Sequence, residues 1–381
     1  MSKININNKI FDYHWLSDTE NAAAQHLLQA HYQSPKRPSF FLSRMPGTSG
    51  NHAEWCELYF MPTLTLSYDS MLPAIIEKGE TLDVKLNSYL TVSRTDHPKT
   101  NGGQPPAGTG PSRSGVTLLG FLNLCLQKSR MNTWFPHRKY DRSFNTVEKN
   151  MAAIADDITI AKRPLSEILF MPRWEKDREH SQEQNQQRLL DKTAKSGKAI
   201  IVIGIVKRWI ASNRNDGGIG VGLDLLDKLF WMPAETAAET EKSFGQLISE
   251  IGKTDRTILA ICTVFRSRQH FSIADIALMR TNKQFITVDS SYELRVADKL
   301  IAEQRAFTKP LRLDGERYLP DFLLNDCQAS WVLEVFGVSG DPEYQERKAQ
   351  KIAYYRDNQV PCWQWTPVTD QAIPEFPLKK A

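Results

Sequence analysis

Two short stretches decide the fold of the C-terminal part: RYLPDFLL at residues 317–324 and WVLEVF at residues 331–336. Their length and their aromatic and β-branched residues predict two strands, the second of which ends at Gly337. Each strand carries one acidic residue among apolar neighbours, Asp321 in the first and Glu334 in the second. A carboxylate is costly to bury unless a cation accompanies it, so the position of Glu334 calls for an explanation.

Around these two strands the pattern predicts four more elements. Residues 292–303 place apolar side chains at helical spacing, and residues 305–313 form a further short strand before a turn at Asp314-Gly315. Residues 342–357 predict a second helix with proline in its first turn, and residues 360–365 a closing strand. The predicted order is therefore helix, strand, strand, strand, helix, strand.

Three carboxylates within this order suggest a shared purpose. Glu293 lies on the first helix, and Asp321 and Glu334 lie on strands that can bring them to a common point. Hard cations such as Mg²⁺ prefer one or two carboxylates together with water and substrate phosphates. The alternative is structural: Glu334 faces solvent on an edge strand, and Asp321 caps a turn or pairs with an arginine.

The motif resembles that of the PD-(D/E)XK nuclease superfamily, because Pro320-Asp321 is followed after twelve residues by Glu334-Val335-Phe336, with Glu293 on the preceding helix. The resemblance implies an α/β, restriction-endonuclease-like αβββαβ core with a mixed sheet flanked by helices, over residues 288–381. It also implies an Mg²⁺- or Mn²⁺-dependent endonuclease that hydrolyses phosphodiester bonds in DNA. Asp321, Glu334 and Glu293 would then be the metal ligands.

One position departs from that superfamily. Its lysine is expected two residues after Glu334, on the same face of the strand, but Phe336 stands there. Some members supply the lysine from the following helix, where Lys351 is the first candidate and Lys348 the second. The alternative is that these lysines are solvated and pair with Glu343 and Glu346. If neither reaches the carboxylates, the domain binds nucleic acid without cutting it, or serves as an adaptor that docks a partner protein.

The rest of the chain predicts a mixed α and β organisation, α+β overall. Residues 91–115 are rich in Gly, Pro, Ser and Thr and predict a linker between a small α+β domain (1–90) and a middle region (116–287). Within the middle region, residues 118–126 predict a helix, 199–206 a buried strand and 258–265 a further strand. The glycine-rich residues 215–222 favour a turn or hairpin over a dinucleotide-binding loop.

Charge is divided unevenly along the chain. The formal net charge is +4, yet residues 291–381 carry 12 Lys and Arg against 14 Asp and Glu, so the excess positive charge lies upstream. Phosphate contacts supply much of the affinity for DNA, so residues 116–287 are the candidate DNA-holding module, although solvated surface explains any single basic cluster equally well. The residues expected to contact DNA are Arg305, Lys309, Arg347, Arg138 and Lys139.

A wider resemblance covers most of the chain. RMPG at residues 44–47, His52 with Cys56, KPL at 309–311 and the two carboxylate motifs together resemble an uncharacterised bacterial family of integrative and conjugative elements, with a domain of unknown function. Cysteines upstream of RMPG in that family imply a zinc site with His52 and Cys56. This chain has no cysteine before Cys56, so a zinc site would need His26 or His31, and core or surface roles are favoured for His52 and Cys56.

Composition excludes several classes of protein. The five cysteines of the 381-residue chain are far apart and form no CxxC pair, which argues against a disulfide framework and a cysteine-based zinc site. No stretch of about 18 apolar residues and no signal peptide is present, so we expect a cytoplasmic protein without membrane contact. DNA is the expected partner, with a homodimer or proteins of a mobile-element or defence system as further candidates.

Overall fold

A computed structural model gives the structure of the chain. It describes residues 74–78, 81–87, 115–136, 142–213, 216–267, 270–311, 319–337 and 342–380, and four strands nearer the N-terminus: β1 (Lys3–Ile6), β2 (Lys9–Asp12), β3 (Leu28–Tyr32) and β4 (Phe40–Arg44). Several predictions fall outside the described residues: the linker at 91–114, the zinc ligands His52 and Cys56, the DNA contacts Arg138 and Lys139, and the turn at 314–315.

A small mixed sheet joins residues from both sides of the predicted linker. Its order is β5 (Ile75–Lys78), β6 (Thr81–Val84), β8 (Ile158–Ile160) and β9 (Arg163–Pro164), with β6 and β8 parallel. Three helices pack near it: α3 (Leu118–Lys128), α4 (Phe144–Ile154) and α5 (Leu165–Ile168). The α3 helix begins at the N-cap Thr117, whose hydroxyl accepts from the Gly120 N–H, and buries nearly all its apolar residues.

The middle of the chain forms a closed barrel of five strands. The strands are β11 (Ile200–Ala211), β12 (Ile219–Leu223), β13 (Phe230–Met232), β14 (Arg256–Ser267) and β15 (His270–Asn282). The sheet order β11-β12-β13-β15-β14 closes because β14 also pairs with the first half of β11. Every pairing is antiparallel except that of β13 with β15. The short strand β10 (Leu169–Phe170) adds to β11 in parallel.

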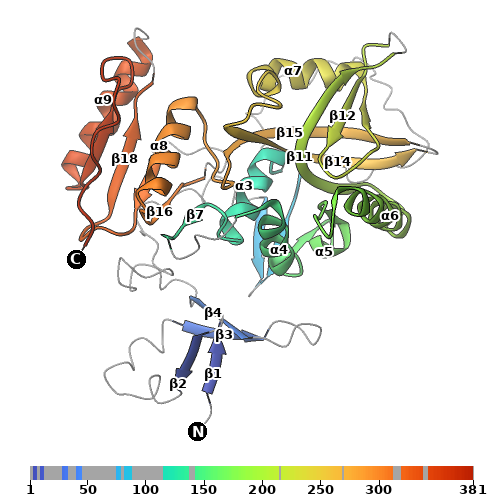
Figure 1. Ribbon diagram of the computed structural model, residues 1–381, viewed down its shortest axis with the longest axis horizontal. Coiled ribbons are helices and arrows are strands. Elements are labelled where there is room, and N and C mark those ends of the chain that lie inside the picture. The colour runs from blue at the N-terminus through green and yellow to red at the C-terminus, as the bar shows by residue number, and fades with distance from the viewer. Residues whose placement is uncertain are drawn as a thin grey trace, which may run out of the picture.

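Two helices flank the barrel (Figure 1). The helix α7 (Ala234–Ile248) connects β13 to β14 and packs Ala237 and Leu247 onto the barrel core. The longer α6 (Arg178–Ser196) precedes β11; it begins at the N-cap Asp177 and ends at Gly197, whose positive φ terminates the helix. The residues 215–222 predicted as a hairpin link β11 to β12, so that prediction is confirmed for its described part.

The C-terminal part is the αβββαβ unit predicted from the sequence. Its elements are α8 (Ser291–Ala302), β16 (Phe307–Thr308), β17 (Phe322–Leu324), β18 (Trp331–Val335), α9 (Pro342–Asp357) and β19 (Cys362–Trp365). The sheet is mixed, because β16, β17 and β18 are antiparallel neighbours whereas β18 and β19 are parallel. The strands β16 and β17 are shorter than predicted.

A fifth strand of this sheet comes from far upstream. β7 (Thr133–Trp134) pairs antiparallel with β16 and forms one edge of the sheet. Trp134 packs in the same core as Phe307 and Phe322, so the C-terminal sheet depends on a segment that the sequence assigned to the middle region. Figure 1 shows this unit on one side of the molecule and the barrel on the other, with α3 between them.

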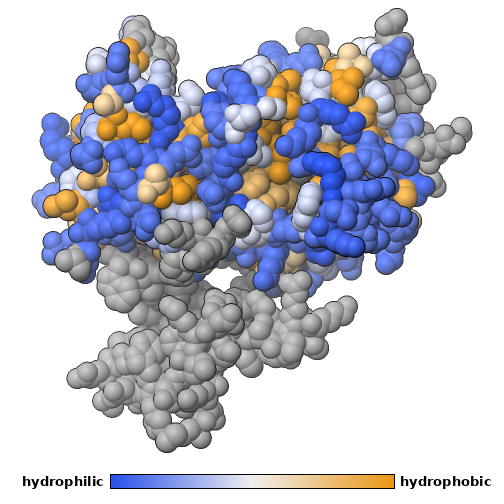
Figure 2. Space-filling view, viewed as in Figure 1, coloured by the Kyte–Doolittle hydropathy of each residue, from blue (hydrophilic) through white to orange (hydrophobic). Residues whose placement is uncertain are grey.

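The face of the molecule seen in Figure 2 is largely polar, and the cysteines among the described residues are unpaired. The face in Figure 2 is mostly hydrophilic, with apolar residues gathered over its central part. Cys125, Cys262, Cys327 and Cys362 are free thiols. Among the helices that the structure describes, none combines the length and apolar character needed to cross a bilayer.

Candidate functional site

Asp321 and Glu334 meet across two antiparallel strands. Phe322 of β17 lies opposite Leu333 of β18, so Asp321, immediately before β17, faces the Glu334 position. The Asp321 Oδ2 atom accepts a hydrogen bond from the Val335 N–H at 2.7 Å, which ties its carboxylate to the β18 backbone beside Glu334. The structure therefore places these two carboxylates side by side on adjacent strands, as the sequence predicts.

Glu334 is buried, with 1% of its surface exposed, and both its oxygens have donors. Oε2 accepts from the Lys351 Nζ at 2.7 Å, and Oε1 accepts from the Tyr355 hydroxyl at 2.7 Å. Burial raises the pKa of Glu334, and the positive charge and hydrogen bond of Lys351 oppose that rise. The alternative in which Glu334 faces solvent on an edge strand is wrong, since β18 lies between β17 and β19.

The two candidate lysines of α9 have different surroundings. The Lys351 Nζ also donates to the Leu319 carbonyl at 2.6 Å, so two acceptors hold it next to the carboxylates. The Lys348 Nζ instead lies 4.3 Å from the centroid of the Phe336 ring and 3.4 Å from the Thr366 hydroxyl. Phe336 therefore occupies the motif position, and Lys351 from the next helix is the lysine that reaches Glu334.

Glu293 lies in the first turn of α8 and forms a second buried cluster. Its Oε2 accepts from the Lys309 Nζ at 2.8 Å and from the Asp289 N–H at 3.1 Å. Lys309 is 3% exposed and also contacts the Asp289 carboxylate at 3.2 Å. Burial raises the pKa of Glu293, and Lys309 opposes this. Burial lowers the pKa of Lys309, but the charges of Asp289, Glu293 and Asp321 outweigh it and leave that pKa raised.

Asp321 links the two clusters electrostatically. Burial raises its pKa to about 6, and the negative charge of Glu334 acts in the same direction, while Lys309 and Lys351 oppose it. Two carboxylates held this close repel each other, and a divalent cation between them would relieve the repulsion. Two carboxylates completed by water suit Mg²⁺, so the residues fit that ion, although the described residues contain no group of three or more potential metal ligands.

The raised pKa of Asp321 predicts a pH-dependent stability difference. The folded protein retains the Asp321 proton to a higher pH than the unfolded chain does. The protonated carboxyl therefore contributes its full share to the free energy of unfolding below about pH 4, and this contribution is lost as pH rises through about 6. Asp321→Asn should therefore gain about 2 kcal/mol relative to wild type between pH 4 and pH 7. Urea unfolding in EDTA at several pH values measures this; a difference between the two proteins that stays flat with pH contradicts it.

The other predicted DNA contacts of this unit are placed differently. Arg305 is 3% exposed and makes hydrogen bonds to both carboxylate oxygens of Asp326, at 2.8 and 3.0 Å. Its guanidinium pairs with the partly buried Asp326 and the Lys309 ammonium with the buried Glu293, so neither is presented to a phosphate in this structure. Arg347 lies exposed on α9, where a DNA contact stays a prediction.

Sequence reasoning missed the roles of Lys309 and Tyr355. Lys309 stands in an otherwise apolar stretch, RAFTKPL, which was a signal of burial, but nothing local to it names Glu293 as the partner. Tyr355 lies four residues after Lys351 on the same helix, but its hydrogen bond to Glu334 depends on how α9 packs against β18.

Comparisons with known proteins give the family of the chain. No curated protein matches the sequence at a significant level. A family model described as "Protein of unknown function (DUF1173)" matches residues 30–368, which includes the barrel, both helices of the C-terminal unit and all three carboxylates. The chain is therefore a member of the DUF1173 family of proteins of unknown function.

Proposed function

We propose that the C-terminal unit is a metal-dependent DNA endonuclease that hydrolyses phosphodiester bonds. The observation that carries the proposal is the placement of Asp321 and Glu334 on adjacent strands with Lys351 hydrogen-bonded to one of them. Two carboxylates placed so that they could share a metal ion, with a lysine beside them, are the features of the PD-(D/E)XK motif that the sequence resembles. Asp321 and Glu334 would hold Mg²⁺, which when bound lowers the pKa of a water and offsets negative charge on the phosphate.

Side chains and backbone groups of the protein itself would hold the two carboxylates in position and place a cation beside the reacting groups. Lys351, fixed between Glu334 and the Leu319 carbonyl, presents a cation where an attacking water or a phosphate oxygen would stand. Tyr355 orients Glu334 through Oε1, and the Val335 N–H orients Asp321 through Oδ2. Lys309 pairs with Glu293 at the start of α8, and a role for Glu293 in holding a metal or a water stays a prediction from the sequence.

The test is incubation of the purified full chain with linear, nicked, branched and single-stranded DNA in Mg²⁺ or Mn²⁺. We expect cleavage of at least one substrate, abolished by EDTA and by Asp321→Ala. No cleavage of any substrate, or cleavage that survives Asp321→Ala, contradicts the proposal. Asp156→Ala, which removes an exposed aspartate away from the unit, is the matched control and should cut like wild type.

A second candidate function is DNA binding without cleavage. It is favoured by one observation: both oxygens of Glu334 accept hydrogen bonds from protein groups, Lys351 and Tyr355. In that case no DNA is cleaved in Mg²⁺ or Mn²⁺, while a gel-shift assay shows binding that persists in EDTA and is little changed by Glu334→Gln. A third reading, the docking adaptor, predicts no gel shift. A role in a mobile element or a defence system, a cytoplasmic location and a homodimer stay predictions from the sequence.

A further inference from the structure

Register partners on neighbouring barrel strands form rows of side chains that face the interior and the outer surface of the barrel in alternation. In one row, Val221 of β12, Phe230 of β13 and Phe271 of β15 are register partners, and all three are buried in the barrel core. The neighbouring row contains Ile210 and Trp231 on either side of Gly220. Since side chains alternate along a strand, this second row faces away from the core.

The outward row has the features of a contact surface. Ile210 is 42% exposed, and Trp231 is half-buried beside it. A Cβ at Gly220 would lie 3.2 Å from the Trp231 ring, so the absence of a side chain lets the indole lie across the strand. Two residues further along β12, a Cβ at Gly222 would lie 2.5 Å from the Arg208 Nε, so the guanidinium likewise lies across β12.

Arg208 is held in place without an acidic partner. Its Nη2 donates to the Asp227 carbonyl at 2.9 Å and to the Leu226 carbonyl at 3.4 Å, both in the β12–β13 loop. Among the residues that the structure describes, the recorded partners of the Arg208 guanidinium are these two carbonyls and not a carboxylate. Further exposed basic residues are Lys207 next to it on β11, Lys228 in the β12–β13 loop, Arg266 near the end of β14 and His270 at the start of β15.

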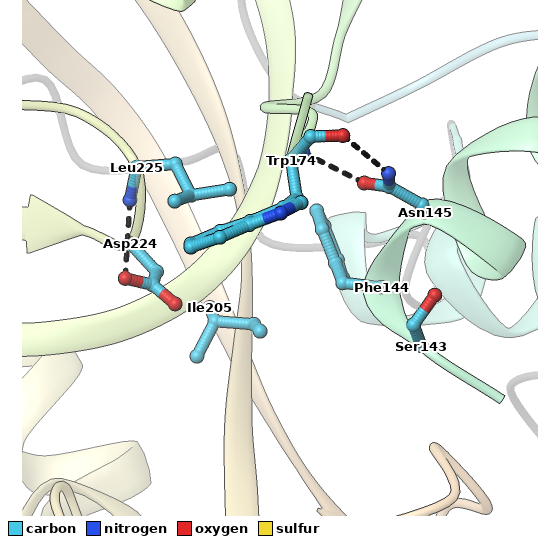
Figure 3. A pocket seen from close by; sticks show the side chains of 7 residues that line it. All are labelled: Ser143, Phe144, Asn145, Trp174, Ile205, Asp224 and Leu225. Carbon is cyan, nitrogen blue, oxygen red and sulfur yellow. Dashed lines mark hydrogen bonds between the residues drawn. The ribbon is translucent and has the colours of Figure 1, made fainter. Parts of the chain in front are cut away.

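The same loop touches a second exposed aromatic side chain. Trp174, 47% exposed, lines a hollow of about 210 Å³ together with Asp224 and Leu225 of the loop (Figure 3). The Asn145 side chain fixes the Trp174 backbone, accepting from its N–H at 2.8 Å and donating to its carbonyl at 2.6 Å. Residues 224–227 therefore contribute both to the hollow that Trp174 lines and to the carbonyls that hold Arg208.

We propose that this surface, consisting of Trp174, Arg208, Ile210 and Trp231 and called the barrel face below, binds single-stranded nucleic acid. Aromatic side chains stack on unpaired bases, and cations beside them hold the phosphates. Five-stranded Greek-key barrels of the OB type bind oligonucleotides on the face of their second and third strands, which here are β12 and β13. Bases in a duplex are already stacked on each other, so two separated indoles select a strand whose bases are free.

The proposal goes beyond the endonuclease proposal, because it places a binding surface on a different part of the chain and needs no metal. Binding at the barrel face and cleavage at Asp321 and Glu334 can therefore fail separately.

The experiment measures fluorescence anisotropy of the full chain in EDTA with labelled oligo(dT) and oligo(U) of about 20 nucleotides, and with a duplex of equal length. We expect at least one single strand to bind roughly tenfold or more tightly than the duplex, with affinity that falls as salt rises. Trp231→Ala and Arg208→Gln should each weaken binding roughly tenfold. Trp231→Phe, which keeps an aromatic face, should retain most of it.

Matched variants separate a lost contact from a lost fold. Arg356→Gln removes the same charge from an exposed site on α9 and should bind like wild type. Trp174→Ala tests the second indole, which lies at the surface and can be removed with little effect on the core. If neither strand binds, if the duplex binds equally well, or if Trp231→Ala and Arg208→Gln bind like wild type, the proposal is overturned.

Discussion

Lys351→Ala is expected to lower the rate of metal-dependent DNA cleavage roughly 100-fold or more, whereas Lys348→Ala should leave it within a few-fold of wild type. The two residues are one helical turn apart on α9 and carry the same charge, so they form a matched pair. Only Lys351 contacts the Glu334 carboxylate, at 2.7 Å, while Lys348 lies against Phe336. The loss in Lys351→Ala should appear in kcat, because the lysine acts on the reacting groups and not on the bulk of the DNA.

Single-turnover cleavage with saturating Mn²⁺ measures this difference, and a gel shift in EDTA checks that both variants still bind DNA. Lys351→Arg keeps the charge but not the shape of the ammonium, so it should recover only part of the rate. Equal losses in the two alanine variants, or a loss in Lys348→Ala alone, would contradict the assignment of Lys351.

Lys309→Met is expected to lower the free energy of unfolding by about 3–5 kcal/mol. The substitution keeps an unbranched side chain but removes a buried cation, which leaves Glu293 charged or protonated without its partner. The matched control is Lys299→Met, at a lysine of α8, the helix that carries Glu293. Lys299 is more exposed and pairs with the partly exposed Glu303, so we expect a loss of about 1 kcal/mol or less there.

A double variant distinguishes lost charge pairing from lost packing. In Lys309→Met with Glu293→Gln, no buried charge remains at the start of α8, so at least half of the lost stability should return. Urea unfolding at pH 7 in EDTA gives the three free energies. A loss in Lys309→Met no larger than that in Lys299→Met, or no recovery in the double variant, would show that the buried pair is unimportant.

The order of elements in the C-terminal unit could be read from the sequence because each element has a strong local pattern. The apolar spacing of α8, the proline at the start of α9 and the β-branched residues of β18 act over a few residues each. Lys351 could also be nominated, since a helix face is fixed by three- and four-residue steps. That Lys351 and not Lys348 reaches Glu334 depends on the packing of α9, which no local pattern specifies.

The pairing of strands that are distant along the chain could not be predicted either, because no local pattern specifies the partner strand. Nothing near Ile200 indicates that this strand pairs with β14 some sixty residues later and so closes the barrel. Nothing near Thr133 indicates a partner at Thr308. The burial of Arg305 and Lys309 followed from such pairings, and a basic residue in a short apolar strand is compatible with either a buried ion pair or a DNA contact until the partner is known.

The edge strand β7 also has a consequence for how the chain folds during synthesis. Trp134 leaves the ribosome long before Phe307, and its place in the C-terminal core does not exist until that later strand has been made. The barrel, whose strands all lie between residues 200 and 282, can close in the meantime. Contacts so distant along the chain form slowly, so completion of the C-terminal sheet is a late step, and the nascent protein must keep an indole and an unpaired strand protected until then.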